Sequence, residues 1–136
     1  MALKICLKPD ERIIIGGAVL QNGGARSDFV IENSVPILRE KDIMGLADAN
    51  SPCRRIYFSI QLMYVDEKNI EEHRATYWKL VKDVTGAAPS TIGLIDRISE
   101  LLLHDRYYQA LKLTHQLIEY EQGVMNHVRS AAAGSL

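Results

Sequence analysis

The sequence predicts an α+β fold, with an N-terminal antiparallel β-rich half packed on or beside a C-terminal bundle of three to four helices. Apolar residues before about Ser51 follow the two-residue period of strands, and those after it follow the helical period. No internal repeat or low-complexity linker separates the halves. We therefore expect a β-rich region at 1–50, a helical region at 51–128 and a frayed tail at 129–136, with the two regions sharing or abutting one core.

Four segments of the first half are typical of strands or of the turns between them. Residues 3–7 alternate between apolar and polar side chains, and residues 13–15 are three consecutive isoleucines, which favour extended backbone. Asn22-Gly23 lies between two apolar segments and tolerates positive φ, so it predicts a tight hairpin there. Residues 35–38 predict a further strand whose proline restricts it to the start or edge of a sheet.

The first helix is expected to begin after Ser51. Ser51 can cap a helix, and proline is favoured at the first helical position, which Pro52 would occupy. Ile56, Ile60 and Met63 then fall on one helical face. A competing strand-like alternation runs through 56–64, but the cap signal favours the helix.

Three further apolar stripes with helical spacing follow. They are Tyr77, Val81 and Val84; Ile95, Ile98 and Leu102; and Leu111, Thr114 and Leu117. Pro89 ends the first of these helices, and Ser90 can cap the second. The last helix is expected to reach about Glu121, where Gly123 interrupts it. In the alternative interpretation, Val124, Met125 and Val128 extend the helix beyond that glycine.

Composition and charge restrict the class of protein. The chain is 47% hydrophobic and 24% charged with a net charge of −1, so any site for a polyanion must be local. Cys6 and Cys53 lie far apart, which predicts two buried reduced thiols rather than a disulfide framework. No apolar run approaches the length of a membrane span. We therefore expect a cytoplasmic protein with no contact to a membrane.

No catalytic constellation is apparent. None of the four histidines has the short spacing or the cysteine neighbours of a zinc site: His73, His104, His115 and His127. Gly16-Gly17 lacks the lysine and hydroxyl of a phosphate loop and is expected to serve a turn. No serine lies in a nucleophile elbow. We expect neither an enzyme, nor a metal ion, nor a cofactor.

Cations and an aromatic residue suggest a site for single-stranded RNA. The candidate residues are Arg39, Lys41, Arg54, Arg55 and Tyr57. Arginine grips phosphate with two parallel hydrogen bonds, a helix N-terminus adds further donors, and aromatic rings can stack on bases. In the alternative interpretation, these cations pair with the neighbouring acids Glu40 and Asp42 instead.

The helical half leaves a second question open. Several large apolar residues lie outside any single stripe, among them Phe58, Leu62 and Leu103. Such residues either complete a compact helical core or line a groove or dimer interface.

Several ordered motifs resemble those of the FlbT family. They are 7–12 (LKPDER), 17–23 (GAVLQNG), 31–33 (IEN), 37–44 (ILREKDIM), 54–58 (RRIYF), 107–112 (YYQALK) and 118–121 (IEYE). The resemblance covers residues 3–121, in order and at natural spacing. It implies a flagellum biosynthesis repressor that acts after transcription, associating with the 5′ untranslated region of flagellin mRNA and lowering its translation and lifetime. The family carries no established catalytic residues.

Two kinds of partner follow from this resemblance. In the first interpretation the partner is the flagellin mRNA leader, held at the cations and Tyr57. In the second, the protein is an adaptor or chaperone for flagellin or another flagellar regulator, and its effect on RNA is indirect. A homo-oligomer is compatible with either.

Overall fold

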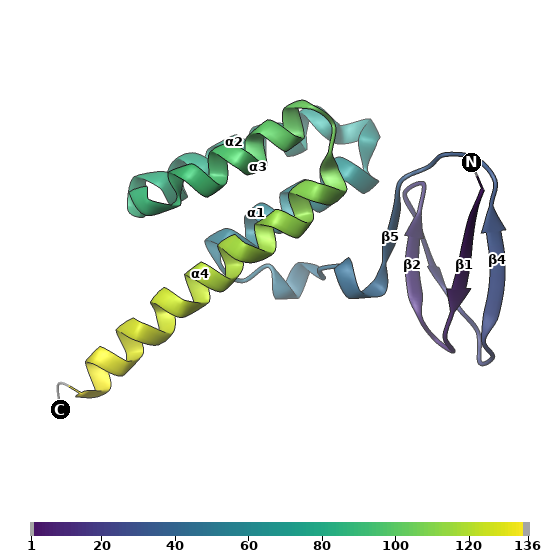
Figure 1. Cartoon of the computed structure of the whole chain (residues 1–136), viewed down its shortest axis with the longest axis horizontal. Coiled ribbons are helices and arrows are strands. Elements are labelled where there is room, and N and C mark those ends of the chain that lie inside the picture. Colours follow the sequence, from purple (N-terminus) through teal and green to yellow (C-terminus); the bar gives the residue numbers. More distant parts are fainter. Residues whose placement is uncertain (1, 135–136) are drawn as a thin grey trace. The chain divides into compact units, whose positions relative to one another are not determined.

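The computed structural model describes residues 2–134, which form two compact units (Figure 1). The strand unit contains the chain up to Ile43 together with Tyr64–Lys68. The helical unit contains Met44–Met63 and the chain from Asn69 on. The predicted α+β fold class, with antiparallel strands first and helices second, is confirmed.

The strand unit holds two small antiparallel sheets. Its strands are β1 (Leu3–Leu7), β2 (Arg12–Ile15), β3 (Ala18–Gln21), β4 (Ser27–Ile31) and β5 (Ile37–Arg39). One sheet pairs β1 with β4, and the other has the order β3-β2-β5. Ile5, Leu7 and Ile13 are buried together, with partly buried apolar side chains from β4 and β5 around them. The strands predicted at 3–7 and 13–15 are therefore present, and the strand predicted at 35–38 lies at Ile37–Arg39, directly after Pro36.

The predicted hairpin at Asn22-Gly23 is wrong. β3 pairs with β2 and β4 pairs with β1, so this segment connects two different sheets. The tight hairpin lies at Gly16-Gly17, where Ile15 pairs directly with Ala18. Both glycines have positive φ (57° and 87°), as a type I′ turn requires.

The helical unit is built from four helices. They are α1 (Pro52–Val65), whose last two residues belong to the strand unit, α2 (Ile70–Ala87), α3 (Ile92–Leu103) and α4 (Tyr107–Gly134). Residues at the predicted helical spacing in α1 are buried, so the helix is confirmed there and the competing strand is excluded. The three stripes predicted for the later helices are buried as well. Tyr77 of α2 and Ser99 of α3 share a buried hydrogen bond of 2.7 Å.

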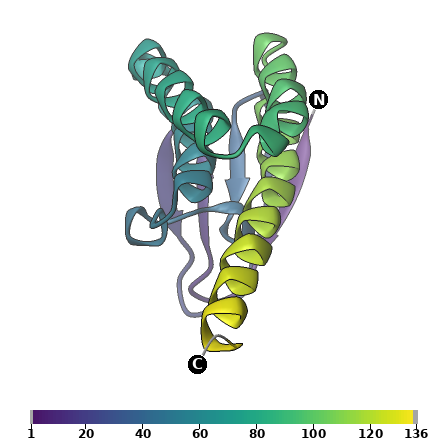
Figure 2. The ribbon, with the colours of Figure 1, turned by 90° about the vertical axis from the view of Figure 1, so that its left-hand side faces the viewer.

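One predicted detail of the later helices is wrong, and the alternative left open for the last helix is decided. Ser90 does not cap α3, because its hydroxyl exchanges a 2.6 Å hydrogen bond with Tyr120. α4 includes Gly123 and stays helical to Gly134. Figure 2 shows this C-terminal helix as one unbroken ribbon. A glycine costs a helix only about 1 kcal/mol relative to alanine, which does not by itself end one. The predicted tail at 129–136 is thus helical as far as 134, and 135–136 lie outside the described residues.

Glu121 of α4 completes the cap of α1. The Ser51 hydroxyl accepts a hydrogen bond from the Arg54 backbone N–H (3.2 Å), which confirms the predicted cap. The Glu121 carboxylate accepts from the Ser51 hydroxyl and from the Cys53 N–H (3.0 Å). A negative charge at a helix N-terminus is stabilising. The Glu121 carboxylate therefore stabilises α1 and, through its two hydrogen bonds, the packing of α4 against it. Burial, assisted by Glu121, raises the pKa of the Cys53 thiol to about 12 and keeps it protonated.

Replacing Glu121 with alanine should therefore destabilise the helical unit by about 1–3 kcal/mol, since two donors lose their acceptor and α1 loses a favourable charge. Urea unfolding followed by far-UV circular dichroism measures this loss. Glu119→Ala is the matched control, because it removes the same charge from an exposed position on the same helix. Equal stability of the two variants would contradict the proposed role of Glu121.

Candidate anion-binding site

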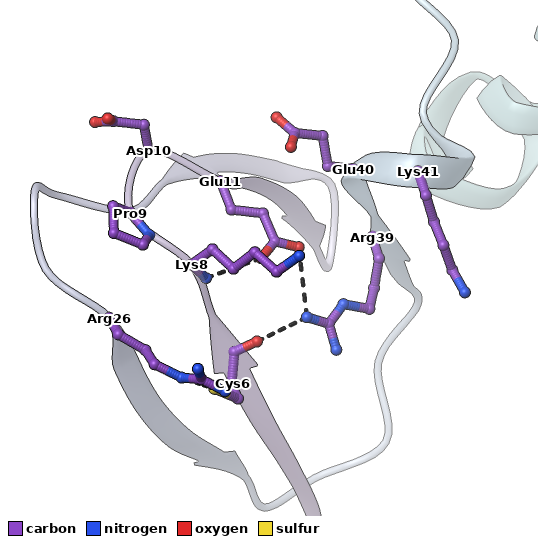
Figure 3. A pocket seen from close by; sticks show the side chains of 9 residues that line it. All are labelled: Cys6, Lys8, Pro9, Asp10, Glu11, Arg26, Arg39, Glu40 and Lys41. Carbon is purple, nitrogen blue, oxygen red and sulfur yellow. Dashed lines mark hydrogen bonds and ion pairs between the residues drawn. The ribbon is translucent and has the colours of Figure 1, made fainter.

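An open concavity of about 700 Å³ lies on the strand unit. It is lined by Cys6, Lys8, Pro9, Asp10, Glu11, Arg26, Arg39, Glu40 and Lys41 (Figure 3). These residues come from the end of β1, the turn after it, the residue before β4, and the end of β5 with the 3₁₀ turn that follows. Four cations and three carboxylates therefore meet at one surface.

The turn between β1 and β2 positions Lys8 and Glu11. The Glu11 N–H donates to the Lys8 carbonyl (3.2 Å), and Asp10 inside the turn adopts a left-handed conformation (φ 62°). The Lys8 N–H in turn donates to the Glu11 carboxylate (2.9 Å). This hydrogen bond, with further help from Arg39, lowers the pKa of Glu11 below its usual value. Glu11 is therefore a fixed anion at neutral pH.

Arg39 is held in place by two acceptors. Its guanidinium donates to the Cys6 carbonyl (2.7 Å) and to the Glu11 carboxylate (3.4 Å). The Arg39 side chain nevertheless keeps 40% of its surface exposed. A guanidinium that is already held in place loses little further conformational entropy when it binds an anion, and this favours binding.

The remaining cations are less constrained. Arg26 donates to the Cys6 sulfur (3.0 Å), and Lys8 and Lys41 are exposed. Among the residues that the structure describes, no carboxylate lies within ion-pair distance of Arg26, Lys8 or Lys41. Asp10 and Glu40 point away from the guanidinium groups of Arg26 and Arg39 (Figure 3). With four cations against three carboxylates, this surface keeps a formal excess of one positive charge.

The predicted site residues are divided between the two units. Arg39 and Lys41 line the concavity, whereas Arg54, Arg55 and Tyr57 belong to α1 in the helical unit. Within residues 2–134, no carboxylate lies at ion-pair distance from Arg54 or Arg55, and Arg39 pairs with Glu11 instead of the acids predicted as its partners.

Tyr57 does not suit the stacking role that the sequence suggests for it. Only 2% of its surface is exposed, and its ring lies 5.0 Å, between centroids, from that of His115 on α4. Tyr57 falls on the same buried face of α1 as Ile60, so its ring has no face open to a base. We therefore remove Tyr57 from the candidate site.

Sequence reasoning did not find Lys8 and Arg26 as members of the site. Both are distant from Arg39 along the chain, and the pairing of β1 with β4 and of β2 with β5 brings them to one surface. The only local signal is the charged turn 8–11 between two apolar strands. This pattern predicts an exposed turn, but it does not predict which other residues lie next to that turn.

The part of the chain that the structure describes holds neither a metal-binding cluster nor a membrane-spanning helix. No group of three or more histidine, cysteine or acidic residues in the part of the chain that the structure describes could hold a metal ion. No helix there has both the length and the apolar character needed to cross a membrane.

Comparison with known proteins identifies the family. A family model described as flagellar protein FlbT matches residues 3–125. A probable flagellum biosynthesis repressor protein FlbT of Caulobacter sp. (strain K31) is 41% identical over 130 residues, covering 94% of this chain and 99% of the relative. A similarly named protein of Bradyrhizobium diazoefficiens, FlbT 1, is 42% identical over 123 residues, covering 90% and 84% of the two chains.

A third relative carries the same name without the word probable. The flagellum biosynthesis repressor protein FlbT of Caulobacter vibrioides (strain ATCC 19089) is 38% identical over 135 residues, covering 98% of this chain and 96% of the relative. No solved structure matches. These matches place the chain among flagellar proteins. It belongs to the FlbT family.

Proposed function

We propose that this protein represses flagellin synthesis after transcription by binding the 5′ untranslated region of flagellin mRNA, with RNA phosphates held in the cationic concavity. The names of three relatives support the repressor role. The observation that carries the choice of site is the gathering of Lys8, Arg26, Arg39 and Lys41 on one open surface. Such an activity would take place in the cytoplasm, where mRNA is translated and degraded.

The concavity suits the phosphate backbone better than the bases. None of its nine lining residues is aromatic, so it offers no platform for stacking. Its guanidinium and ammonium groups are the donors that phosphate oxygens accept. Contacts of this kind position an RNA without reading its sequence. Arg54 and Arg55, at the start of α1, are a separate candidate for phosphate contacts on the helical unit.

A salt titration tests whether binding is electrostatic. With about four phosphates neutralised, the logarithm of the affinity should fall against the logarithm of the salt concentration with a slope of about −3 for single-stranded RNA. The measurement uses the full chain and a purified flagellin leader RNA, for example by fluorescence anisotropy. The absence of measurable binding to that RNA at low salt would overturn the proposal.

Removing two cations tests the site itself. The double variant Lys8→Ala with Lys41→Ala leaves the hydrogen bonds of Arg39 intact, so the strand unit should stay folded. We expect about tenfold weaker RNA binding and a salt slope that is smaller by about 1.4, which corresponds to two lost phosphate contacts. Lys79→Ala with Lys82→Ala removes the same charge from exposed positions on α2 and serves as the control.

An equal loss of affinity in both double variants would show that only net charge matters and would dismiss the concavity as the site. Arg54→Ala with Arg55→Ala, measured alongside, decides whether the start of α1 takes part. Unchanged affinity in that third variant would remove both arginines from the proposed interface.

An apolar groove in the helical unit favours a second candidate function, namely an adaptor or chaperone for flagellin or another flagellar regulator. The groove is lined by Pro52, Cys53, Val84, Ala87, Ala88, Thr91, Tyr120, Glu121, Val124 and Met125. Val128, one helical turn beyond Val124, is 60% exposed. A stable complex with purified flagellin, together with no affinity for the leader RNA, would favour this adaptor function over the repressor.

A further inference from the structure

The outer strand of the three-stranded sheet, β3, is exposed along its whole length. It pairs with β2 on one side only, because the sheet has the order β3-β2-β5. All four of its residues are exposed, with Val19 at 68% and Leu20 at 42%. A strand of this kind presents unpaired backbone groups and apolar side chains to whatever can add a further strand.

The hairpin determines which backbone groups of β3 point outward. Ile15 and Ala18 close the two-residue turn and therefore exchange both hydrogen bonds of their pair. Antiparallel pairs alternate between bonded and non-bonded, so Leu20 also bonds to β2, while the N–H and C=O groups of Val19 and Gln21 face away from it. The free side of β3 thus offers two donors and two acceptors in the pattern of an antiparallel strand.

The charge pattern of the outer strands indicates which partner suits this edge. Residues 13–25 contain no charged side chain. The other outer strands each carry charge: Lys4 on β1, Asp28 on β4 and Arg39 on β5. Pairing any of those with an identical strand would bring like charges together, which disfavours self-association. Among the described outer strands, only β3 can pair with an identical strand without repulsion between like charges.

We propose that β3 pairs antiparallel with β3 of a second copy of this chain, about a two-fold axis at Leu20. Val19 then lies opposite Gln21 of the second copy, and these two symmetry-related pairs make four backbone hydrogen bonds. The two three-stranded sheets become one continuous sheet with the order β5-β2-β3-β3-β2-β5. The two Leu20 residues form a non-bonded pair with Cα atoms about 4.5 Å apart.

The size of the interface determines how it should behave in solution. A four-residue edge is short, and an interface below about 1,200 Å² is typical of weak association. We therefore expect an equilibrium between monomer and dimer that moves toward the dimer as concentration rises. Isologous contacts of this kind close on themselves, so assembly should stop at two copies.

Sedimentation velocity of the full chain, without RNA, between about 1 μM and about 1 mM covers the range of such weak association. The expected result is a mean mass that rises with concentration from one copy toward two. Val19→Lys should hold the mass at one copy, because it places like charges at the edge of both strands. Val30→Glu adds a charge at a 53% exposed position on β4, opposite Lys4, and is the control that should still dimerise. A monomeric wild type, or a folded Val19→Lys variant that dimerises as before, would overturn the proposal.

A cysteine trap decides the matter if Val19→Lys fails to fold. Leu20→Cys should form an intermolecular disulfide under mild oxidation, because the Cα separation of a non-bonded pair suits a disulfide. Val30→Cys is the control for exposure alone, and the wild type measures the background from Cys6 and Cys53. Disulfide-linked dimers of Leu20→Cys well above both backgrounds support the pairing, and their absence rejects it.

Discussion

Replacing Gly17 with alanine is expected to destabilise the strand unit by about 3 kcal/mol. Gly17 has a φ of 87°, in the left-handed region that L-residues avoid. A β-carbon there would also lie 2.9 Å from the backbone carbonyl oxygen of Val65, closer than such contacts occur. One of these atoms is a backbone oxygen and the other is a β-carbon, so neither can move away by rotating a side chain. The segment Tyr64–Lys68 would have to shift relative to the rest of the strand unit.

A graded series separates the two causes. Gly16→Ala meets only ordinary contacts, with the Val35 side chain at 3.9 Å, but has a φ of 57°, so it should cost about 1–2 kcal/mol for the left-handed backbone alone. Gly23→Ala has no neighbour within 4 Å and no left-handed φ, and should be close to neutral. Urea unfolding by circular dichroism gives the three values. A Gly17 variant no less stable than the Gly16 variant would show that the approach of Val65 has no consequence.

Replacing Asn22 with alanine is expected to cost about 2–3 kcal/mol, because one side chain holds together the connection between the two sheets. The Asn22 amide donates to the carbonyls of Lys8 (2.8 Å), Ala25 (3.0 Å) and Leu7 (3.3 Å). Its carbonyl oxygen accepts from the Ser27 hydroxyl (3.0 Å). All of these hydrogen bonds disappear together in the variant.

Asn33→Ala is the matched control, since it removes the same group from an exposed position of the strand unit. Hydrogen exchange over residues 3–31, measured with urea unfolding, should show faster exchange in β1 and β4 of the Asn22 variant. The Asn33 variant should match the wild type. Wild-type exchange rates in the Asn22 variant would show that the backbone pairing holds the sheets without this side chain. Because Lys8 borders the concavity, the Asn22 variant should also weaken RNA binding if the proposed site is correct.

Asn22 and Gly16-Gly17 also explain why the hairpin was predicted at the wrong place. Both segments have the composition of a tight turn, and Asn-Gly is the stronger short-range signal of the two. What decides between them is the partner of each strand: β2 pairs with β3, and β4 returns to β1. The Asn22 side chain then donates a hydrogen bond to a carbonyl fifteen positions away, and local sequence patterns do not predict contacts over that separation.

The helices were more predictable than the strands. The cap at Ser51, the proline after it and the period of the apolar residues are local features, and they locate α1 and the buried stripes of α2 and α3 correctly. The sequence does not show two contacts between helices. Ser90 bonds Tyr120 rather than its own helix, and Glu121 reaches the start of α1 from seventy residues away.

The sequence by itself determined the fold class, most of the regular elements and, through its motifs, the resemblance to the FlbT family that comparison confirmed. These properties depend on residues close together in the chain, where period and capping act. The tertiary structure alone decided which cations share a surface: it placed Lys8 and Arg26 beside Arg39, assigned Arg54 and Arg55 to the other unit, and buried Tyr57. The physical reason is that strand pairing and burial join residues far apart in sequence, and a charge pattern read along the chain does not contain those contacts.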